Sequence, residues 1–110
     1  MNHPLQKYKS IGTWIEDYQK QWENDPELES KLNALQRFCQ FVGKDPDSII
    51  NDCLAQVDDG MRIRTKQRRM YTESIKVFES SFEAREGRKW GNCVRSFFIH
   101  NGVAMIADII

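Results

Sequence analysis

The sequence of 110 residues predicts an all-α fold, a small bundle of five to six helices. Apolar side chains recur every three to four residues along nearly the whole chain, which is the helical period. Asp-Pro pairs stand where helices would begin, and glycines stand where they would end. No long stretch alternates apolar and polar residues, so we expect no extended sheet. A chain of this length is long enough for one domain and can bury a hydrophobic core without disulfide bonds or metal ions.

We expect an N-terminal extension over residues 1–10 and a helical domain over residues 11–110. The first helix covers about residues 11–23, where aromatic side chains recur every fourth position. These are Trp14, Tyr18 and Trp22. We interpret this stripe as core, because aromatic residues at helical spacing are more often buried than part of a binding platform.

Asp-Pro pairs open the second and third predicted helices. Proline fits the first helical position because it has no N–H to lose there, and aspartate before it can act as the N-cap. Asp25-Pro26 therefore opens a helix that ends at Gly43. Asp45-Pro46 opens a helix that runs to about residue 57 and is ended by Asp58-Asp59-Gly60.

Two further helices follow in the second half of the chain. A long helix is expected over about residues 64–85, with Gly87 breaking it. The next helix covers about residues 89–100 and is capped by Asn101-Gly102. Residues 103–110 are too apolar for a free tail, so either they dock as a sixth helix or the natural chain continues beyond them.

Composition and cysteine usage favour a reduced, cytoplasmic protein. No apolar run approaches the roughly 18 residues that cross a bilayer, and the first residues lack the apolar stretch of a secretory signal. The chain has only 3 cysteines, widely spaced, which indicates no disulfide framework. We expect no membrane association.

The motifs of metal, phosphate-loop and nucleophile chemistry are absent. Two histidines and three scattered cysteines have no metal-ligand spacing. The cysteines lie on apolar faces and are interpreted as core, and His100 as a helix C-terminal residue favoured by the helix dipole. We expect no cofactor, no small-molecule ligand and no catalytic residue.

The zero net charge hides an asymmetry between the halves of the chain. Residues 1–61 carry 6 basic and 11 acidic side chains, a net charge of −5, whereas residues 62–110 carry 10 basic and 5 acidic, a net charge of +5. Segregated positive charge suggests an anionic partner for the second half.

Five cations within eight residues form the densest basic run, which consists of Arg62, Arg64, Lys66, Arg68 and Arg69. Like charges at this density repel one another, and a phosphate backbone would relieve the repulsion and release counterions. Two interpretations stay open at this stage, a DNA contact or a solvated helix start.

The helix expected near residues 89–100 carries a second set of candidates. Arg88 and Lys89 stand at its expected N-terminus, where backbone amides favour anions. Asn92 and Arg95 are three residues apart and share a face, and these residue types can read adenine and guanine in a major groove. The alternative is an ordinary amphipathic helix.

A third set lies on the polar side of the second helix. It consists of Lys31, Asn33, Gln36, Arg37 and Gln40. In isolation an ordinary solvent-exposed face is the favoured interpretation of this set.

Two segments resemble the core-binding domain of tyrosine recombinases and phage integrases. Residues 32–50, Leu-Asn-Ala-Leu-Gln-Arg-Phe-Cys-Gln-Phe-Val-Gly-Lys-Asp-Pro-Asp-Ser-Ile-Ile, resemble its second helix and the following turn. Residues 90–103, with their Arg-Ser-Phe-Phe core and terminal Asn-Gly, resemble its later groove-facing helix. The likeness covers about residues 11–106.

The resemblance implies a SAM-like helical bundle that clamps double-stranded DNA. Contacts would come from two helices, through Lys31, Asn33, Gln36 and Arg37 on one and Lys89, Asn92 and Arg95 on the other. The tyrosine-bearing catalytic domain of such a recombinase is absent from this chain, so the implied role is non-catalytic. Other recombinase protomers would be further partners. The segment over residues 61–86 is longer than the family's usual connection, and its basic run has no family counterpart.

A helical protein-interaction module without DNA binding is the alternative. The apolar residues 103–110 could seed a dimer, or the acidic first half could meet a basic partner. A stand-alone transcriptional regulator would need a tight two-helix turn, and no suitable spacing is present.

Overall fold

The computed structural model describes residues 4–21, 26–58 and 60–105, and within the first range the side chains of residues 4–17. Its elements in chain order are η1 (Pro4–Lys7), α1 (Lys9–Gln21), α2 (Leu28–Val42), α3 (Pro46–Cys53), β1 (Leu54–Val57), β2 (Gly60–Ile63), α4 (Thr65–Glu79) and α5 (Ala84–His100). Helices dominate this order, so the predicted all-α bundle is confirmed.

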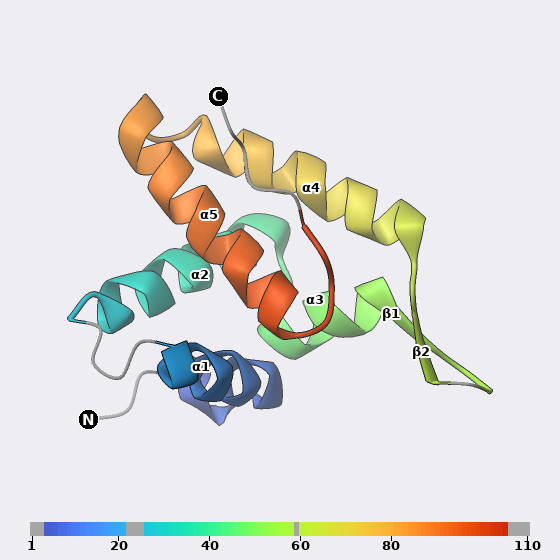
Figure 1. The fold of residues 1–110 in the computed structure, drawn as a ribbon. Coiled ribbons are helices and arrows are strands. Elements are labelled where there is room, and N and C mark those ends of the chain that lie inside the picture. Colours follow the sequence, from blue (N-terminus) through green and yellow to red (C-terminus); the bar gives the residue numbers. More distant parts are fainter. Residues whose placement is uncertain (1–3, 22–25, 59, 106–110) are drawn as a thin grey trace.

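Helix α5 lies at the centre of the bundle and contacts α1, α2 and α4 (Figure 1). Its Phe97 and Phe98 are fully buried. Phe97 meets Trp14 of α1 edge-on, with ring centroids 6.0 Å apart, and Phe98 lies 6.5 Å from Phe38 of α2. Such edge-to-face aromatic pairs stabilise a core beyond the area they bury. The interpretation of Trp14 as core is confirmed, whereas Trp22 and the side chain of Tyr18 lie outside the described residues.

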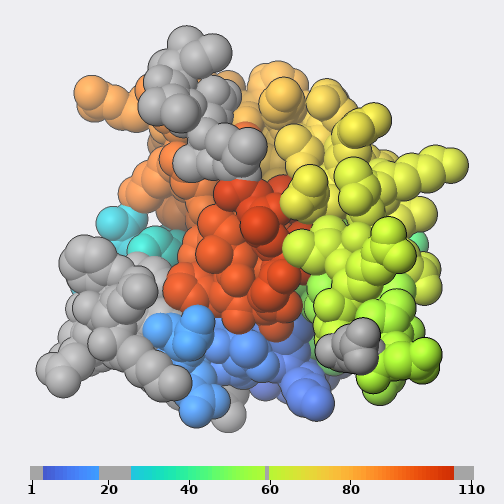
Figure 2. All heavy atoms as spheres, turned by 45° about the vertical axis from the view of Figure 1, so that its right-hand side comes forward, coloured from blue at the N-terminus to red at the C-terminus, as the bar shows by residue number. Residues whose placement is uncertain are grey.

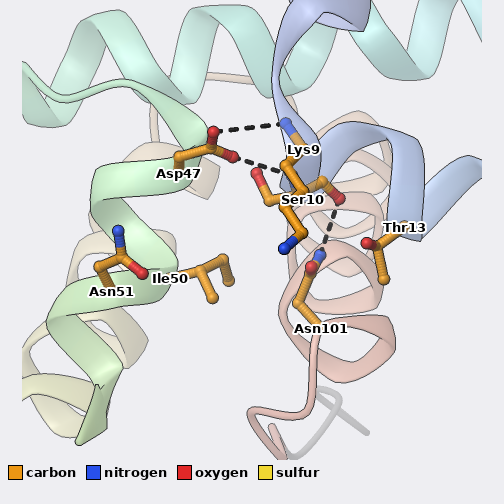
Figure 3. A pocket seen from close by; sticks show the side chains of 7 residues that line it. All are labelled: Lys9, Ser10, Thr13, Asp47, Ile50, Asn51 and Asn101. Atoms are coloured by element: carbon orange, nitrogen blue, oxygen red, sulfur yellow. Dashed lines mark hydrogen bonds between the residues drawn. The ribbon is translucent and has the colours of Figure 1, made fainter.

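Residues 4–10 belong to the bundle rather than standing outside it. Leu5 in η1 is 5% exposed and packs into the core. Helix α1 begins at Lys9, two residues earlier than expected, and its start is capped from α3. The Asp47 carboxylate accepts hydrogen bonds from the backbone N–H groups of Lys9 (3.3 Å) and Ser10 (2.8 Å) (Figure 3). A carboxylate at a helix N-terminus satisfies amides that have no intrahelical partner.

Helix α3 begins as the sequence predicts. Asp45 is the N-cap, and its carboxylate accepts a hydrogen bond of 2.8 Å from the backbone N–H of Ser48. Pro46 occupies the first turn, and Gly43 ends α2 with a left-handed φ of 75°. Helix α2 differs, because it begins at Leu28, so Pro26 precedes the helix instead of opening it. Asp25 lies outside the described residues.

A short hairpin replaces the expected end of the third helix. Helix α3 stops at Cys53, and β1 pairs antiparallel with β2, with Leu54 opposite Ile63 and Val57 opposite Gly60. The prediction of helix to about residue 57 is therefore wrong. The ladder between the strands satisfies backbone groups that a longer helix would have satisfied internally. The hairpin projects from the bundle (Figure 1).

Helices α4 and α5 form a close hairpin, and both of its expected boundaries were misplaced. Helix α4 ends at Glu79 and α5 begins at Ala84, so Gly87 lies inside α5 and does not break the chain. A Cβ at Gly87 would lie 2.4 Å from the carbonyl oxygen of Glu79. The glycine is needed there because two backbones approach closely, not because a helix ends.

The end of α5 agrees with the predicted cap. Gly102 has a φ of 90°, and the N–H of Val103 donates to the carbonyl of Phe98 at 2.9 Å. Val103 is fully buried, so the segment after α5 docks on the bundle, but residues 103–105 form no helix. Residues 106–110 lie outside the described part of the chain. No helix among residues 4–21, 26–58 and 60–105 is long and apolar enough to cross a membrane.

Candidate nucleic-acid interface

The basic run lies where the hairpin joins the start of α4. We call Arg62, Arg64, Lys66, Arg68 and Arg69 the basic cluster; it spans β2 and the first turns of α4. Arg68 is partly buried and the other four side chains are exposed. Figure 2 shows β2 and α4 beside the end of α5 on one face of the molecule.

The Arg64 guanidinium interacts electrostatically with the Asp52 carboxylate, but the basic cluster forms no close ion pair among the described residues. None of its five cations forms an ion pair with any residue that the structure describes. Arg68 and Arg69 line a hollow of about 440 Å³ between α4 and the segment after α5. Thr65 and Thr72 also line this hollow. Unpaired cations beside hydroxyl groups suit phosphate oxygens as ligands.

A second group of predicted residues meets between α2 and α5. They surround a cavity of about 340 Å³, which we call the α2–α5 hollow. It is lined by Trp14, Lys31, Lys89, Asn92, Cys93 and Ser96. The chain positions of Lys31 and Asn92 are far apart, and only the packing of α5 on α2 brings them together. The indole Nε1 of Trp14 donates to the Ser96 hydroxyl at 3.2 Å, so the floor of this hollow is ordered by the core.

Lys89 is tied to acidic and aromatic neighbours at the rim of this hollow. Its Nζ forms an ion pair with the Glu27 carboxylate and lies 4.8 Å from the centre of the Trp90 ring. Both partners of the ion pair are about half exposed, so solvent screens the interaction. A phosphate group would compete with Glu27 for this lysine.

Arg95 does not lie on an exposed groove-facing surface, and that expectation was wrong. The side chain is 3% exposed, and its guanidinium donates to both carboxylate oxygens of Glu79, at 3.0 and 2.9 Å. It also donates to Asn92 Oδ1 at 2.9 Å. The cause is the close approach of α4, which covers this side of α5 and supplies the counter-charge.

The remaining predicted residues are distributed over other faces. Arg88 and Lys89 lie in the second turn of α5, because the helix begins at Ala84 with Glu83 as N-cap, so they do not surround an N-terminal anion site. Arg37 is exposed on α2 and stacks over the Phe82 ring at 4.7 Å. Asn33 is exposed and Gln36 partly buried on the same helix. The predicted residues thus form separate regions rather than one concave surface.

Titratable groups near these regions have structural roles. Burial opposes ionisation of Asp52, but hydrogen bonds from Lys44 and the Tyr71 hydroxyl outweigh it and lower the pKa of this carboxyl. Burial raises the pKa of Cys39 to about 12 and of Cys53 to about 11, so neither is a ready nucleophile. No cluster of three His, Cys, Asp or Glu side chains in the described part of the chain could hold a metal ion.

A hollow of about 250 Å³ between α1, α3 and the end of α5 is also structural (Figure 3). Besides the Asp47 cap, the Asn101 side-chain amide donates to the carbonyls of Ser10 and Phe97, which ties α5 to α1. The sequence pattern predicted neither these two hydrogen bonds of Asn101 nor the role of Glu79. Glu79 carries no local signal, because its partner lies on another helix.

The comparisons with known proteins return nothing. No family model matches the chain, and neither a curated protein nor a solved structure is significantly similar to it. The recombinase resemblance therefore rests on the residues quoted above.

Proposed function

We propose that this chain binds double-stranded DNA as the N-terminal core-binding domain of an integrase-like tyrosine recombinase. The observation that carries the proposal is the basic cluster, whose five cations form no ion pair among the described residues. Placing such charges against a phosphate backbone relieves their repulsion and releases counterions.

The α2–α5 hollow supports the recombinase part of the proposal. Helices α2 and α5 carry the two segments that resemble the core-binding domain, and they bring Lys31, Lys89 and Asn92 to a common hollow. In this proposal the basic cluster contributes the positioning contacts to the backbone, and the hollow contributes contacts nearer the bases.

Salt-dependent binding of a fluorescent 20-base-pair duplex, followed by anisotropy, tests the proposal. We expect affinity to fall steeply between 50 and 200 mM salt, with a log–log slope of roughly −0.9 per phosphate contact. The triple variant R64A/R68A/R69A should weaken binding and flatten this slope by roughly 2 to 3. Lys76→Ala, on the same helix but beyond the cluster, is the matched control and should alter the slope little. Undetectable duplex binding at 50 mM salt would sink the proposal.

A protein-interaction module is the second candidate, favoured by exposed apolar side chains. Val77 is 56% exposed on α4 and Phe41 is 50% exposed on α2. Of residues 103–110, the segment that could seed a dimer, Val103 is buried within its own bundle, and residues 106–110 lie outside the described part of the chain. Light scattering at increasing concentration separates the candidates: a dimer that V77E disrupts, in a chain that binds no duplex, would favour this function.

A further inference from the structure

We propose that Asn92 contacts DNA through its amide nitrogen alone, so it recognises single hydrogen-bond acceptors and does not form the two-bond contact that reads adenine. This inference rests on the proposed function and assigns the chemistry of one contact within it. Asn92 is partly buried and lines the α2–α5 hollow beside Lys31 and Lys89.

The direction in which the amide faces is decided by Arg95. A guanidinium has only donors, so the Asn92 atom that lies 2.9 Å from Arg95 Nη1 must be the carbonyl oxygen. The side-chain oxygen and nitrogen of an asparagine are exchangeable by a simple flip, but here the flip would place an N–H group against an N–H donor. The amide polarity of Asn92 is therefore set by its neighbour.

Arg95 itself has no freedom to turn away. Both oxygens of Glu79 accept from its guanidinium, and the pair is buried between α4 and α5. A Cβ at Gly91 would overlap the Glu79 carboxylate, so the absence of a side chain there makes room for the pair. Glu79 and Arg95 thus act as positioning residues for the amide of Asn92.

The Asn92 Nδ2 group makes no hydrogen bond to any residue in the described part of the chain. It carries two donors and no acceptor. Reading adenine requires the oxygen and the nitrogen of the amide to face the base together, and the oxygen is committed to Arg95. The acceptors that remain are a phosphate oxygen or a single acceptor atom on a base edge, such as N7 or O6 of guanine, N7 of adenine or O4 of thymine.

Asn92→Asp and Asn92→Ala test this assignment by anisotropy. Asp keeps the oxygen that faces Arg95 and replaces the outward NH₂ by a negatively charged oxygen. We expect a loss of affinity of about 3- to 10-fold for Asn92→Ala, the range of one hydrogen bond, and a larger loss for Asn92→Asp. Thermal unfolding of each variant shows whether the bundle is intact. If Asn92→Asp binds as tightly as wild type, the inference is wrong. That result would mean that an oxygen of Asn92, and not its nitrogen, faces the DNA.

Three duplexes distinguish the source of the acceptor. One is rich in G·C pairs, one has the same sequence with 7-deazaguanine, which lacks N7, and one contains only A·T pairs. A loss from Asn92→Ala on the G·C duplex that vanishes with 7-deazaguanine identifies guanine N7. A loss that persists with 7-deazaguanine but is absent on the A·T duplex identifies guanine O6, and an equal loss on all three identifies phosphate. A loss confined to the A·T duplex identifies adenine N7 or thymine O4, whereas no loss on any duplex that wild type binds refutes the inference. Failure of wild type to bind any of them instead refutes the proposed function.

Discussion

Arg95 of α5 and Glu79 of α4 form a bidentate ion pair that is almost completely buried. The nitrogen–oxygen distances are 3.0 and 2.9 Å, and the side chains are 3% and 12% exposed. The pair removes the arginine from solvent, and with it one predicted DNA contact. It also orders Asn92, through a third hydrogen bond from the same guanidinium.

Removal of one partner of this pair should destabilise the bundle strongly. Glu79→Ala leaves a buried guanidinium without a counter-charge, so we expect a loss of about 3–5 kcal/mol in the free energy of unfolding, measured with urea. The double variant E79A/R95M should lose less than Arg95→Met and Glu79→Ala added together, because no charge is left buried alone. Additive losses would show that the two side chains do not interact.

Glycine-to-alanine substitutions should have opposite effects on two helices. Gly87→Ala places a Cβ 2.4 Å from the Glu79 backbone carbonyl, which must shift, so we expect destabilisation of about 1–3 kcal/mol. Gly12→Ala in α1 is the matched control, since a Cβ there meets nothing within 4 Å. It should stabilise the chain by about 0.5–1 kcal/mol through helix propensity. Thermal unfolding of both variants checks the contrast; equal effects would contradict the close α4–α5 packing.

Acid should unfold the protein through Asp47 and Asp52. The hydrogen bonds that Lys9 and Ser10 donate to Asp47 outweigh its burial, and the pKa of each carboxyl lies below the ordinary value of 3.8. The stabilisation is therefore complete above about pH 4 and is lost as the pH falls through the lowered pKa of the folded state. Urea midpoints between pH 7 and pH 2 measure this loss.

Matched variants assign the acid transition. Asp47→Asn and Asp52→Asn should each flatten the fall of stability below pH 4 and lower stability at pH 7. Asp58→Asn, at the exposed turn of the hairpin, is the control and should leave the profile unchanged. A wild-type profile that is flat from pH 5 to pH 2 would contradict the role of both carboxyls.

The cysteines should resist alkylation in the folded protein. Cys39 and Cys53 are buried and form thiolates only near pH 12 and pH 11, so iodoacetamide at pH 8 should label them very slowly. Labelling should be rapid in about 6 M urea, which strongly denatures a small domain. Mass spectrometry of timed samples measures both rates. Equal rates in the two conditions would show that these thiols are not in the core.

Local signals predicted the helices well where all their determinants lie within a few residues. Asp45 caps α3 through the N–H of Ser48, three residues away, and Gly43 ends α2 by its own left-handed conformation. The hairpin was missed because a strand of four residues has no distinctive period, and its stability depends on a partner strand. Gly87 was mistaken for a break because its reason is a contact with Glu79 on another helix.

The amino-acid sequence by itself determined the helical fold class, the core position of Trp14, and the dense positive charge of the basic cluster. These properties depend on periodicity and composition, which are read along the chain. Only the tertiary structure decided that Arg95 is buried, that the basic cluster forms no ion pair among the described residues, and which atom of Asn92 faces outward. Charge pairing and burial depend on side chains that come together from different helices, and no local sequence pattern encodes which of them meet.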